Sequence, residues 1–394
     1  MVDKELRILW HSVAPFVSSG YGVVTKNVAL PLGQKYPLII SNYYGLMTGA
    51  SIRIANIRIL PTVADNNGQI TVEHYIEKFK IDLPIVMSDF WPFTDFSKLN
   101  HSMFYGPVDS SEYNEVDVQT MKNYSYFIPC SEFGGRVYKK LTGREPTAVI
   151  PHGVDLAVYK PYPKKESRTL FNFKKNKFWW GIVAANSDSE PRKGWDDIFI
   201  TLQRFKEEFP SEAKNWMVFA YTKPNDSRGY NLPWMVRTCG LSKQVLFPEH
   251  LAQIVGLPDP EMAKLYSSFD VFLNASRREG FCLPVLEAQA CGIPVIATDS
   301  SALTELVKGH GWSVKTGETY FTMRGWPCEK VDRDDLLKQM EDAYFNPEQR
   351  KVYRQAGLEF VKSYDWKDIV NDQWIPLLEK MRHKGLNMIF TNKK

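Results

Sequence analysis

The run 269–307 constrains the fold of this chain more than any other stretch of the sequence. Its pattern predicts a strand at 270–274, a polar loop that ends in glycine, a helix at 283–290, a β-branched strand at 294–297 and another helix from 302. A similar alternation of strands and helices continues along the whole chain. Such alternation is typical of parallel sheets covered by helices on both faces, so the sequence predicts the α/β class.

Two carboxylates bracket the predicted helix: Glu279 lies just before it and Glu287 lies inside it. Backbone N–H groups at a helix start lack partners within the helix and can point at an anion such as a phosphate. The inner carboxylate can accept hydrogen bonds from ribose hydroxyls, and the outer one can bind a sugar hydroxyl or hold the loop. This pattern describes a pocket for a nucleotide that carries a sugar, but an ordinary strand–helix–strand unit with exposed glutamates also fits it. The turn and helix start consist of Gly280, Phe281, Cys282 and Leu283.

The residues from Glu279 to Pro284, followed by Glu287 and by 290–298, resemble the signature of the family-4 retaining glycosyltransferases. The resemblance implies the GT-B fold, in which two Rossmann-like domains have parallel sheets facing across a cleft and a C-terminal helix crosses back to the first domain. It also implies that Glu287 binds the ribose of a nucleoside diphosphate sugar and that Glu279 binds hydroxyls of the donor sugar. A UDP-sugar is favoured over a GDP-sugar as this co-substrate.

A length of 394 residues predicts two domains. We expect an N-terminal, acceptor-side Rossmann-like domain at 1–159, a linker at 160–177 and a C-terminal nucleotide-sugar-binding domain at 178–365. The resemblance implies that the last helix, at about 366–394, packs on the first domain. The expected linker is rich in lysine and arginine, and we interpret it either as a solvated hinge or as a basic edge for an anionic acceptor.

Composition adds few constraints on the partners of the protein. A hydrophobic content of 44% with 11 tryptophans argues against disorder, and a net charge of +4 allows acidic partners without requiring them. The five cysteines form no CxxC pair, which predicts free thiols in a reducing compartment. Because no apolar stretch approaches the length of a membrane span, we expect a cytoplasmic protein that touches membranes at most peripherally.

The first half of the chain offers a glycine-rich turn after its first strand, 7–11. Gly20 and Gly22 precede a predicted helix at 23–32, and they would let the backbone approach a phosphate or a sugar. A plain tight turn is the alternative. The position of the two glycines resembles that of the glycine loop in the first domain of the family, which adds them to the candidate donor site.

Arg192 and Lys193 follow the first predicted strand of the second half and precede a helix at 196–209. A bidentate arginine and a point-charge lysine can neutralise a departing diphosphate, and the segment resembles the phosphate-binding segment of the family. The alternative is a charge cluster at a helix start. The family often has another arginine directly after a glycine at this strand end, where Ala185 and Asn186 stand here, so the sequence departs from the family pattern at one contact with the diphosphate.

The chemistry implied by the resemblance is electrostatic. Arg192, Lys193 and the helix start would hold the leaving diphosphate, which itself helps to deprotonate the acceptor, so no protein nucleophile is needed. Many relatives have a histidine near the donor sugar. The corresponding strand end, 105–109, has none, and Asp109 is the candidate replacement, with His101 as a weaker one.

The acceptor stays open at this point between a glycan, a lipid, a protein and a modified nucleic acid. The loop that carries Asp89, Trp91 and Asp95 either binds the acceptor or packs as an aromatic turn. The 332–334 segment matches a DxD metal pattern, but it precedes a helix as an N-terminal charge cluster, and the resemblance implies no metal and no cofactor. Two further functions compete with transfer: a nucleotide-sugar epimerase or hydrolase of the same fold, and a catalytically weak sugar- or nucleic-acid-binding protein.

Overall fold

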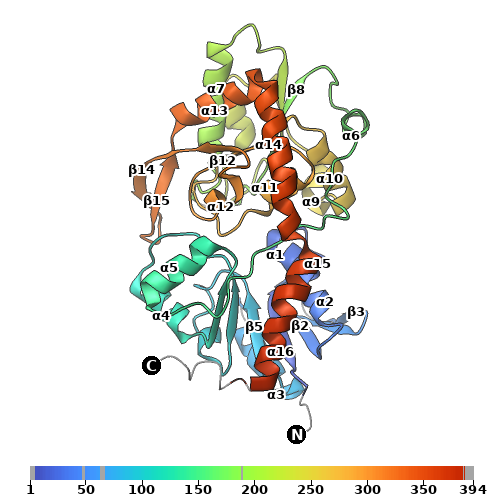
Figure 1. Ribbon diagram of the computed structural model, residues 1–394, viewed down its shortest axis with the longest axis vertical. Helices are drawn as coiled ribbons and strands as arrows, with labels where there is room; N and C mark the ends of the chain where they lie inside the picture. Colours follow the sequence, from blue (N-terminus) through green and yellow to red (C-terminus); the bar gives the residue numbers. More distant parts are fainter. Residues whose placement is uncertain (1–4, 47–48, 63–66, 188–189, 385, 387–394) are drawn as a thin grey trace. The chain divides into compact units, whose positions relative to one another are not determined.

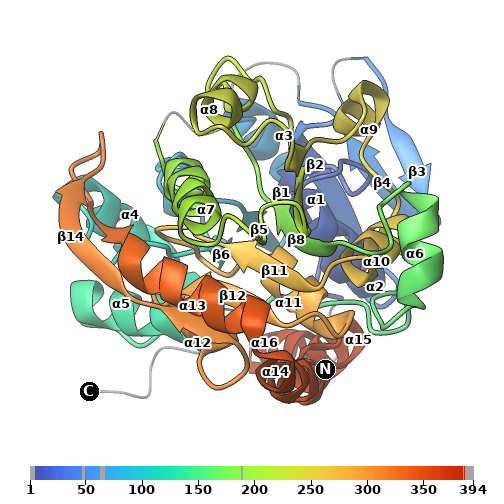
Figure 2. The ribbon, with the colours of Figure 1, turned by 90° about the horizontal axis from the view of Figure 1, so that it is seen from above.

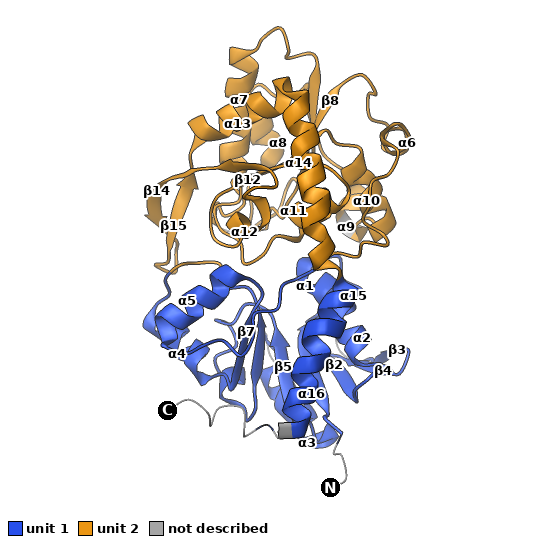
Figure 3. Cartoon of the chain, in the orientation of Figure 1, with its two compact units in different colours: residues 1–108, 112–153, 366–394 blue, residues 109–111, 154–365 orange. Residues whose placement is uncertain are grey.

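The computed structural model describes residues 5–46, 49–62, 67–187, 190–384 and 386. The chain divides into two compact units, which Figure 3 shows in different colours. The first unit comprises 1–108, 112–153 and 366–394, and the second comprises 109–111 and 154–365. Each unit contains its own sheet, so each is described by itself.

The sheet of the first unit has seven strands in the order β3-β4-β2-β1-β5-β6-β7 (Figure 1). All neighbours are parallel except the β3–β4 hairpin, which turns at Ala55 with a positive φ of 51°. The central strands are buried along their whole length, as expected for a sheet with covered faces. The strands are β1 (Ile8–Val13), β2 (Leu38–Tyr44), β3 (Ile52–Ile54), β4 (Ile57–Leu60), β5 (Leu83–Met87), β6 (Met103–Gly106) and β7 (Tyr126–Pro129).

The helices of the first unit include the C-terminal segment of the chain. This segment packs through aromatic rings, because Trp374 lies edge-on to Trp10 of β1 at 5.9 Å between ring centroids, and Tyr36 Oη donates to Glu379 at 2.7 Å. Residues 387–394 of the expected last helix lie outside the described residues. The α-helices are α1 (Gly20–Val24), α2 (Leu30–Leu32), α3 (Gln69–Phe79), α4 (Glu115–Asn123), α5 (Glu132–Thr142), α15 (Trp366–Asp368) and α16 (Ile375–Lys384), with π-helical turns at Thr25–Ala29 and Ile369–Trp374 and a 3-10 turn at Phe96–Lys98.

The main sheet of the second unit has six parallel strands in the order β10-β9-β8-β11-β12-β13. Gly181 of β8 is required by packing, since a Cβ there would lie 2.0 Å from the ring of Phe269. The strands are β8 (Phe178–Val183), β9 (Trp216–Tyr221), β10 (Val245–Leu246), β11 (Val271–Asn274), β12 (Val295–Thr298) and β13 (Trp312–Val314).

Helices flank this second sheet, and Figure 2 shows α7 and α13 side by side on it. Both helices contribute to the apolar core, which also contains Trp180, Trp195 and Trp216. The helices are α6 (Lys164–Leu170), α7 (Trp195–Glu208), α8 (Leu232–Thr238), α9 (His250–Val255), α10 (Asp259–Ser267), α11 (Leu283–Ala290), α12 (Leu303–Val307), α13 (Arg333–Phe345) and α14 (Pro347–Phe360), with a 3-10 turn at Val361–Tyr364.

Two segments differ from the sequence-based expectation. The expected linker, 160–177, belongs to the second unit and contains α6, because the buried Arg168 bonds to Asp270 at 2.6 Å and to Ser268 O at 2.9 Å. The segment from 316 to 331, for which no strand was predicted, forms an antiparallel hairpin of β14 (Thr316–Phe321) and β15 (Pro327–Val331). In the part of the chain that the structure describes, no helix combines the length and the apolarity needed to cross a bilayer.

Candidate active site

The candidate site of the second unit lies where its sheet reverses direction. From β8 the chain continues outward to β9 and β10, whereas from β11 it continues the other way to β12 and β13. Ligands of open parallel sheets bind outside the carboxyl ends of the strands at such a switch point. The loops that leave the neighbouring strands β8 and β11 carry Arg192, Lys193 and Glu279, so the structure brings these three candidates together at this point.

Gly194 allows the two loops to approach each other. It caps α7 with a positive φ of 63°, and a Cβ at this position would lie 2.0 Å from the carbonyl oxygen of Ala275. The backbone N–H of Arg277 also donates to the carbonyl oxygen of Arg192 at 2.8 Å. This close backbone contact holds the Arg192–Lys193 segment against the loop that follows β11.

Glu279 is buried between two cations. Its carboxylate accepts from Arg192 Nη1 at 3.1 Å and from Lys193 Nζ, and its backbone N–H donates to Ser301 Oγ at 2.8 Å. Burial acts to raise the pKa of Glu279, but the charges of Lys193 and Arg192 outweigh burial and lower this pKa to about 2. Glu279 is therefore ionised at neutral pH, so both of its carboxylate oxygens act only as hydrogen-bond acceptors.

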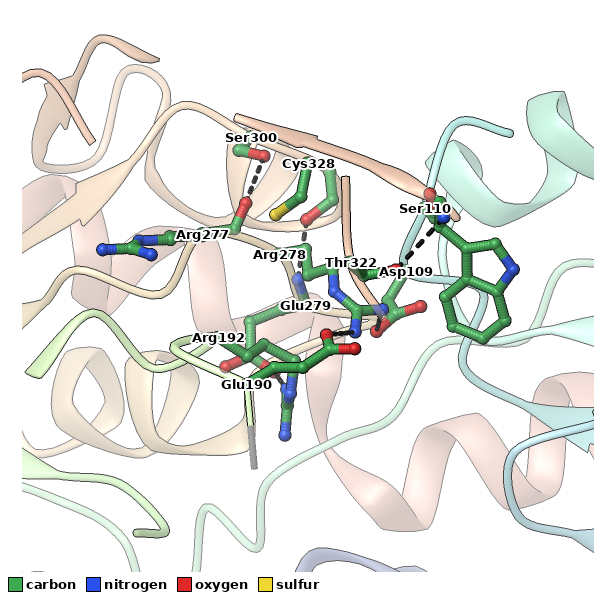
Figure 4. Close-up of polar contacts among 12 residues, drawn as sticks. Asp109, Ser110, Glu190, Arg192, Arg277, Arg278, Glu279, Ser300, Thr322 and Cys328 are labelled. Atoms are coloured by element: carbon green, nitrogen blue, oxygen red, sulfur yellow. Dashed lines mark hydrogen bonds and ion pairs between the residues drawn. The ribbon is translucent and has the colours of Figure 1, made fainter. Parts of the chain in front are cut away.

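Arg278 is a site residue that the sequence interpretation missed (Figure 4). Its Nη1 bonds to Asp109 Oδ2 at 2.9 Å, and its Nη2 bonds to Glu190 Oε2 at 2.8 Å. Its guanidinium also lies 5.3 Å from the ring centroid of Trp326, in the β14–β15 hairpin. The structure thus places Asp109, the candidate replacement for the family histidine, in an ion pair next to the loop of Glu279. The doubled arginine before Glu279 was the only signal in the sequence.

Arg277 makes a separate ion-pair network. It bonds to Asp197 Oδ2 at 2.9 Å and to Asp196 Oδ2 at 2.6 Å at the start of α7, and Arg333 bonds to Asp197 Oδ1 at 2.7 Å. Burial raises the pKa of Asp197, and the neighbouring Asp196 adds to this shift. This network joins the β11 loop to the first turns of α7 and α13.

The turn before α11 has a strained residue. Cys282, the N-cap, has φ 97° and ψ 74°, in the left-handed region that side chains other than glycine rarely adopt. Burial raises the pKa of its thiol to about 12, so the thiol is neutral. Leu283 is the first residue of α11, and Pro284 follows, as is typical of a helix start. Gly280 and Phe281 complete the turn between Glu279 and this start.

Glu287 lies on α11 in surroundings opposite to those of Glu279. It is buried, and the hydroxyl of Tyr266 on α10 donates to its Oε2 at 2.7 Å. Burial raises the pKa of Glu287 to about 7, although the Tyr266 hydrogen bond acts against this shift. A neutral pH therefore lies in the range where this carboxyl changes its charge.

Asn186 stands where the resemblance led us to look for an arginine, and the structure gives it a structural role. Its Nδ2 donates to Tyr230 O at 2.8 Å, and its Oδ1 accepts from the backbone N–H of Tyr230 at 2.9 Å. Its side chain is buried and spans the loops that follow β8 and β9. An amide with both ends bonded to the backbone holds these two loops together.

The remaining candidates lie in the first unit. Ser19 caps α1 and accepts from the backbone N–H of Gly22 at 3.2 Å, next to Gly20. A Cβ at Gly22 would lie 2.2 Å from the carbonyl oxygen of Val17, which explains this glycine by packing. His101 precedes β6 and so lies at the amino ends of the parallel strands, the opposite edge from the Gly20 turn. Its position therefore argues against a role beside that turn.

The loop after β5 packs as an aromatic turn. Phe90, Phe93 and Phe96 are buried in the core of the first unit, whereas Asp95 forms an exposed ion pair with Lys98 at 2.8 Å. Asp89 and Trp91 belong to the same loop. These positions favour the packing interpretation of this segment.

The DxD-like segment caps a helix. Asp332 accepts from the backbone N–H groups of Asp334 and Asp335 at the start of α13, and Asp334 also pairs with Arg204. Its acidic side chains are thus occupied by helix capping and an ion pair. Within the described ranges, no group of three or more His, Cys, Asp or Glu side chains has an arrangement that could hold a metal ion.

Comparisons with solved structures define the class of fold. Sucrose-phosphate synthase from Thermosynechococcus elongatus is similar over 95% of this chain and 99% of its own, with a TM-score of 0.74 and 15% identity. HepE from Anabaena, in complex with UDP-glucose, is similar over 96% of this chain and 100% of its own, with a TM-score of 0.72 and 15% identity. The α/β prediction is confirmed, and the protein has the GT-B fold.

Comparisons of sequence concern mainly the second unit. Residues 190–360 match the family model of the glycosyl transferases group 1, so the second unit carries a domain of this group. The mannosyltransferase LpsB of lipopolysaccharide core biosynthesis from Rhizobium meliloti is 28% identical over 42% of this chain and 44% of its own length. D-inositol 3-phosphate glycosyltransferase from Paenarthrobacter aurescens is 26% identical over 56% of this chain and 48% of its own. The chain thus spans about half the length of these curated relatives.

Proposed function

We propose that the protein is a glycosyltransferase that moves a sugar from a nucleoside diphosphate sugar to a hydroxyl acceptor. The observation that carries this proposal is the pairing of Glu279 with Arg192 and Lys193 at the switch point of the second sheet. Two cations and one carboxylate leave one net positive charge there, which favours a diphosphate. A donor diphosphate can share these cations while Glu279 turns toward the sugar.

The neighbouring groups complete the proposed donor site. The segment from Gly280 to Leu283 leads into the start of α11, where free backbone N–H groups and the helix dipole would stabilise a phosphate. Glu287, in its ionised form, would accept hydrogen bonds from the ribose. Asp109, held by Arg278, is the candidate group beside the donor sugar. The Gly20–Gly22 turn is the candidate contribution of the first unit.

We further propose that the reaction retains the anomeric configuration and needs no metal. The family-4 signature supports retention, and the arginine and lysine supply positive charge that a metal would otherwise provide. UDP-sugars are favoured as donors because a protein of the same fold has been solved with UDP-glucose. All five cysteines are free thiols, which supports a cytoplasmic site of action.

The relatives do not single out one class of acceptor. Their names refer to lipopolysaccharide core biosynthesis and to D-inositol 3-phosphate, which differ in size and polarity. We therefore propose a hydroxyl acceptor without choosing between a glycan, a lipid, a protein and a modified nucleic acid. A lipid acceptor would require peripheral contact with a membrane.

A donor panel tests this function. UDP-glucose, UDP-galactose, UDP-N-acetylglucosamine and GDP-mannose, each radiolabelled in the sugar, are incubated with the protein with and without EDTA. Release of nucleotide and labelled sugar from one donor, unaffected by EDTA, is the expected result, and NMR of the product gives its anomeric configuration. At a free donor concentration of about 100 times its Kd, the true donor should raise the free energy of unfolding by about 2.7 kcal/mol, which thermal unfolding measures. Binding without turnover would instead indicate a sugar-binding protein, and a converted nucleotide sugar would indicate an epimerase.

A further inference from the structure

Arg278 joins two carboxylates that come from distant parts of the sequence. Asp109 lies 169 residues before it and Glu190 lies 88 residues before it, yet one guanidinium bonds to both. The three side chains are only 10%, 20% and 16% exposed, unlike a surface pair such as Lys98 and Asp95, in which both are more than half exposed. Ion pairs of low exposure hold their partners in defined positions, whereas surface pairs contribute little.

Both partners of Arg278 are fixed further by the β14–β15 hairpin. The backbone N–H of Met323 donates to the other oxygen of Glu190 at 3.2 Å, and Ser110 Oγ donates to Pro327 O at 3.2 Å. The guanidinium of Arg278 itself lies over the ring of Trp326, between β14 and β15. Figure 4 shows Arg278 between Asp109 and Glu190. Three separate segments of the second unit thus meet at this one guanidinium.

The side chain of the neighbouring Arg277, in the same loop, has a different set of partners. Its carboxylate partners, Asp196 and Asp197, lie on the first turn of α7, and Arg333 shares both of them. The partners of Arg278 are instead a candidate site residue, Asp109, and Glu190, which lies two residues before Arg192 in the cationic loop. The side chain of Arg278 therefore bonds both to Asp109 and to the cationic loop, whereas the side chain of Arg277 bonds only to the first turn of α7 among these segments.

We propose that Arg278 is a positioning residue that holds the Asp109 carboxylate and the Arg192–Lys193 loop in their working geometry. This proposal depends on the proposed function of the same site. Arg278 acts through Asp109 and Glu190 and does not touch the substrate. Removing the Arg278 side chain lets the Asp109 carboxylate and the Arg192–Lys193 loop move. Small displacements of positioned groups lower the rate of the chemical step.

The test compares Arg278→Gln with Arg333→Gln, which removes one guanidinium from the neighbouring network but leaves Asp197 paired with Arg277. UDP-glucose and GDP-mannose are the probes, and nucleotide release is measured. We expect Arg278→Gln to lower kcat by about 10- to 100-fold with a change in donor KM of less than about threefold. Arg333→Gln should keep the wild-type kcat, and its change in Tm should be small, because Arg333 is 37% exposed and Asp197 keeps Arg277. Arg278→Lys keeps the charge but lacks the planar fork that directs Nη1 and Nη2 at two separate carboxylates, so its kcat should be intermediate.

A double-mutant cycle with Asp109→Asn shows whether Arg278 acts through Asp109. If it does, Arg278→Gln adds little to the loss already caused by Asp109→Asn. The positioning role would be overturned if the kcat losses of the two single variants multiplied in the double variant, or if either single variant kept the wild-type kcat. The transferase function would remain intact in both cases. A wild-type protein that turns over neither probe, nor any other donor of the panel, would overturn the proposed function and this role with it.

Discussion

Glu279 and Glu287 are eight residues apart and both are buried, yet their carboxyl groups have opposite properties. The pKa of Glu279 is lowered to about 2, and that of Glu287 is raised to about 7. Burial acts in the same direction on both, because it always disfavours the charged form. The difference comes from the neighbours: Glu279 has two cations, and Glu287 has a tyrosine hydroxyl.

This difference suggests a division of labour within one short segment. Glu279 has a permanent charge and can orient both the cations and the donor sugar. Glu287 has a charge that depends on pH and on what binds beside it, as expected for a group whose ligand carries only hydroxyls. The helix start between them separates the two environments.

The largest effect is expected from removing the charge of Glu279. Glu279→Gln leaves Arg192 and Lys193, which are 22% and 15% exposed, without their shared counter-charge. We expect a loss of about 100- to 1,000-fold in kcat, since the group orients charge in the transition state. The free energy of unfolding in urea should fall by about 3 kcal/mol, as when one partner of a buried pair is removed.

Lys193→Met is the matched control for this change. It removes one of the two cations, so Glu279 keeps Arg192 and its pKa rises only part of the way to the ordinary value. A kcat of Glu279→Gln within threefold of the wild-type value would show that the charge of Glu279 has no part in the reaction, and the contrast with Glu287 would then be structural only.

The next effect concerns donor affinity and its pH dependence. Glu287→Gln should raise the KM for UDP-glucose by about tenfold, because hydrogen bonds between ribose hydroxyls and a charged group are lost, with kcat changed little. In the wild type, KM should fall by about tenfold between pH 6 and pH 8, since a carboxyl with a pKa of about 7 ionises in this range.

Initial rates at five pH values measure this dependence. In Glu287→Gln, the KM should stay constant over the same range, because the amide does not ionise. Tyr266→Phe is the companion variant: it removes the donor to Glu287, so the pKa of this carboxyl rises further and the fall in KM shifts to higher pH. A KM that changes equally in the wild type and in Glu287→Gln would assign the pH dependence to another group.

The sequence predicted this segment well because its signals are local. Strands, helices and both glutamates of 269–307 follow from residues close together in the chain, and the structure places each element there. Arg278 was missed because its partners are 169 and 88 residues away, and no local pattern encodes them. The α6 segment was missed for the same reason, since Arg168 bonds to Asp270, 102 residues later. The β14–β15 hairpin was missed because its strands are largely exposed and lack an alternating apolar pattern.

A smaller effect is expected in the pH dependence of stability, with opposite signs for the two glutamates. The pKa of Glu279 is below its ordinary 4.5 in the folded state, so its contribution to stability is complete above pH 4.5 and is lost as the pH falls toward 2. The pKa of Glu287 is above 4.5, so its contribution is complete below pH 4.5 and is lost as the pH rises through about 7.

The difference in the free energy of unfolding between the wild type and each glutamine variant isolates these contributions. From urea unfolding between pH 3 and pH 8, the stability advantage of the wild type over Glu279→Gln should shrink toward the acid end. The free energy of unfolding of the wild type, relative to that of Glu287→Gln, should instead decrease from pH 4.5 to pH 7, by about 3 kcal/mol. Parallel curves for both variants would mean that the two carboxyls titrate alike, contrary to the opposite pKa shifts.

The smallest effect is expected at Cys282, in the turn that separates the two glutamates. Its φ of 97° is unfavourable for any residue with a Cβ, and glycine relieves this strain at the cost of a more flexible unfolded chain. The thiol also accepts a weak hydrogen bond from Asn274 Nδ2 at 3.5 Å, which glycine loses. The balance of these terms predicts that Cys282→Gly stabilises the fold by about 0.5–1 kcal/mol.

Cys282→Ala separates the strain from the thiol, because it keeps the Cβ and removes only the sulfur. Alanine should be less stable than the wild type, whereas glycine should be more stable, as measured by urea unfolding. Since neither substitution changes a charge, the pH profiles of Glu279 and Glu287 should be the same in both variants. A stabilisation by alanine as large as that by glycine would show that the sulfur, rather than the backbone angle, is the source of strain in the turn.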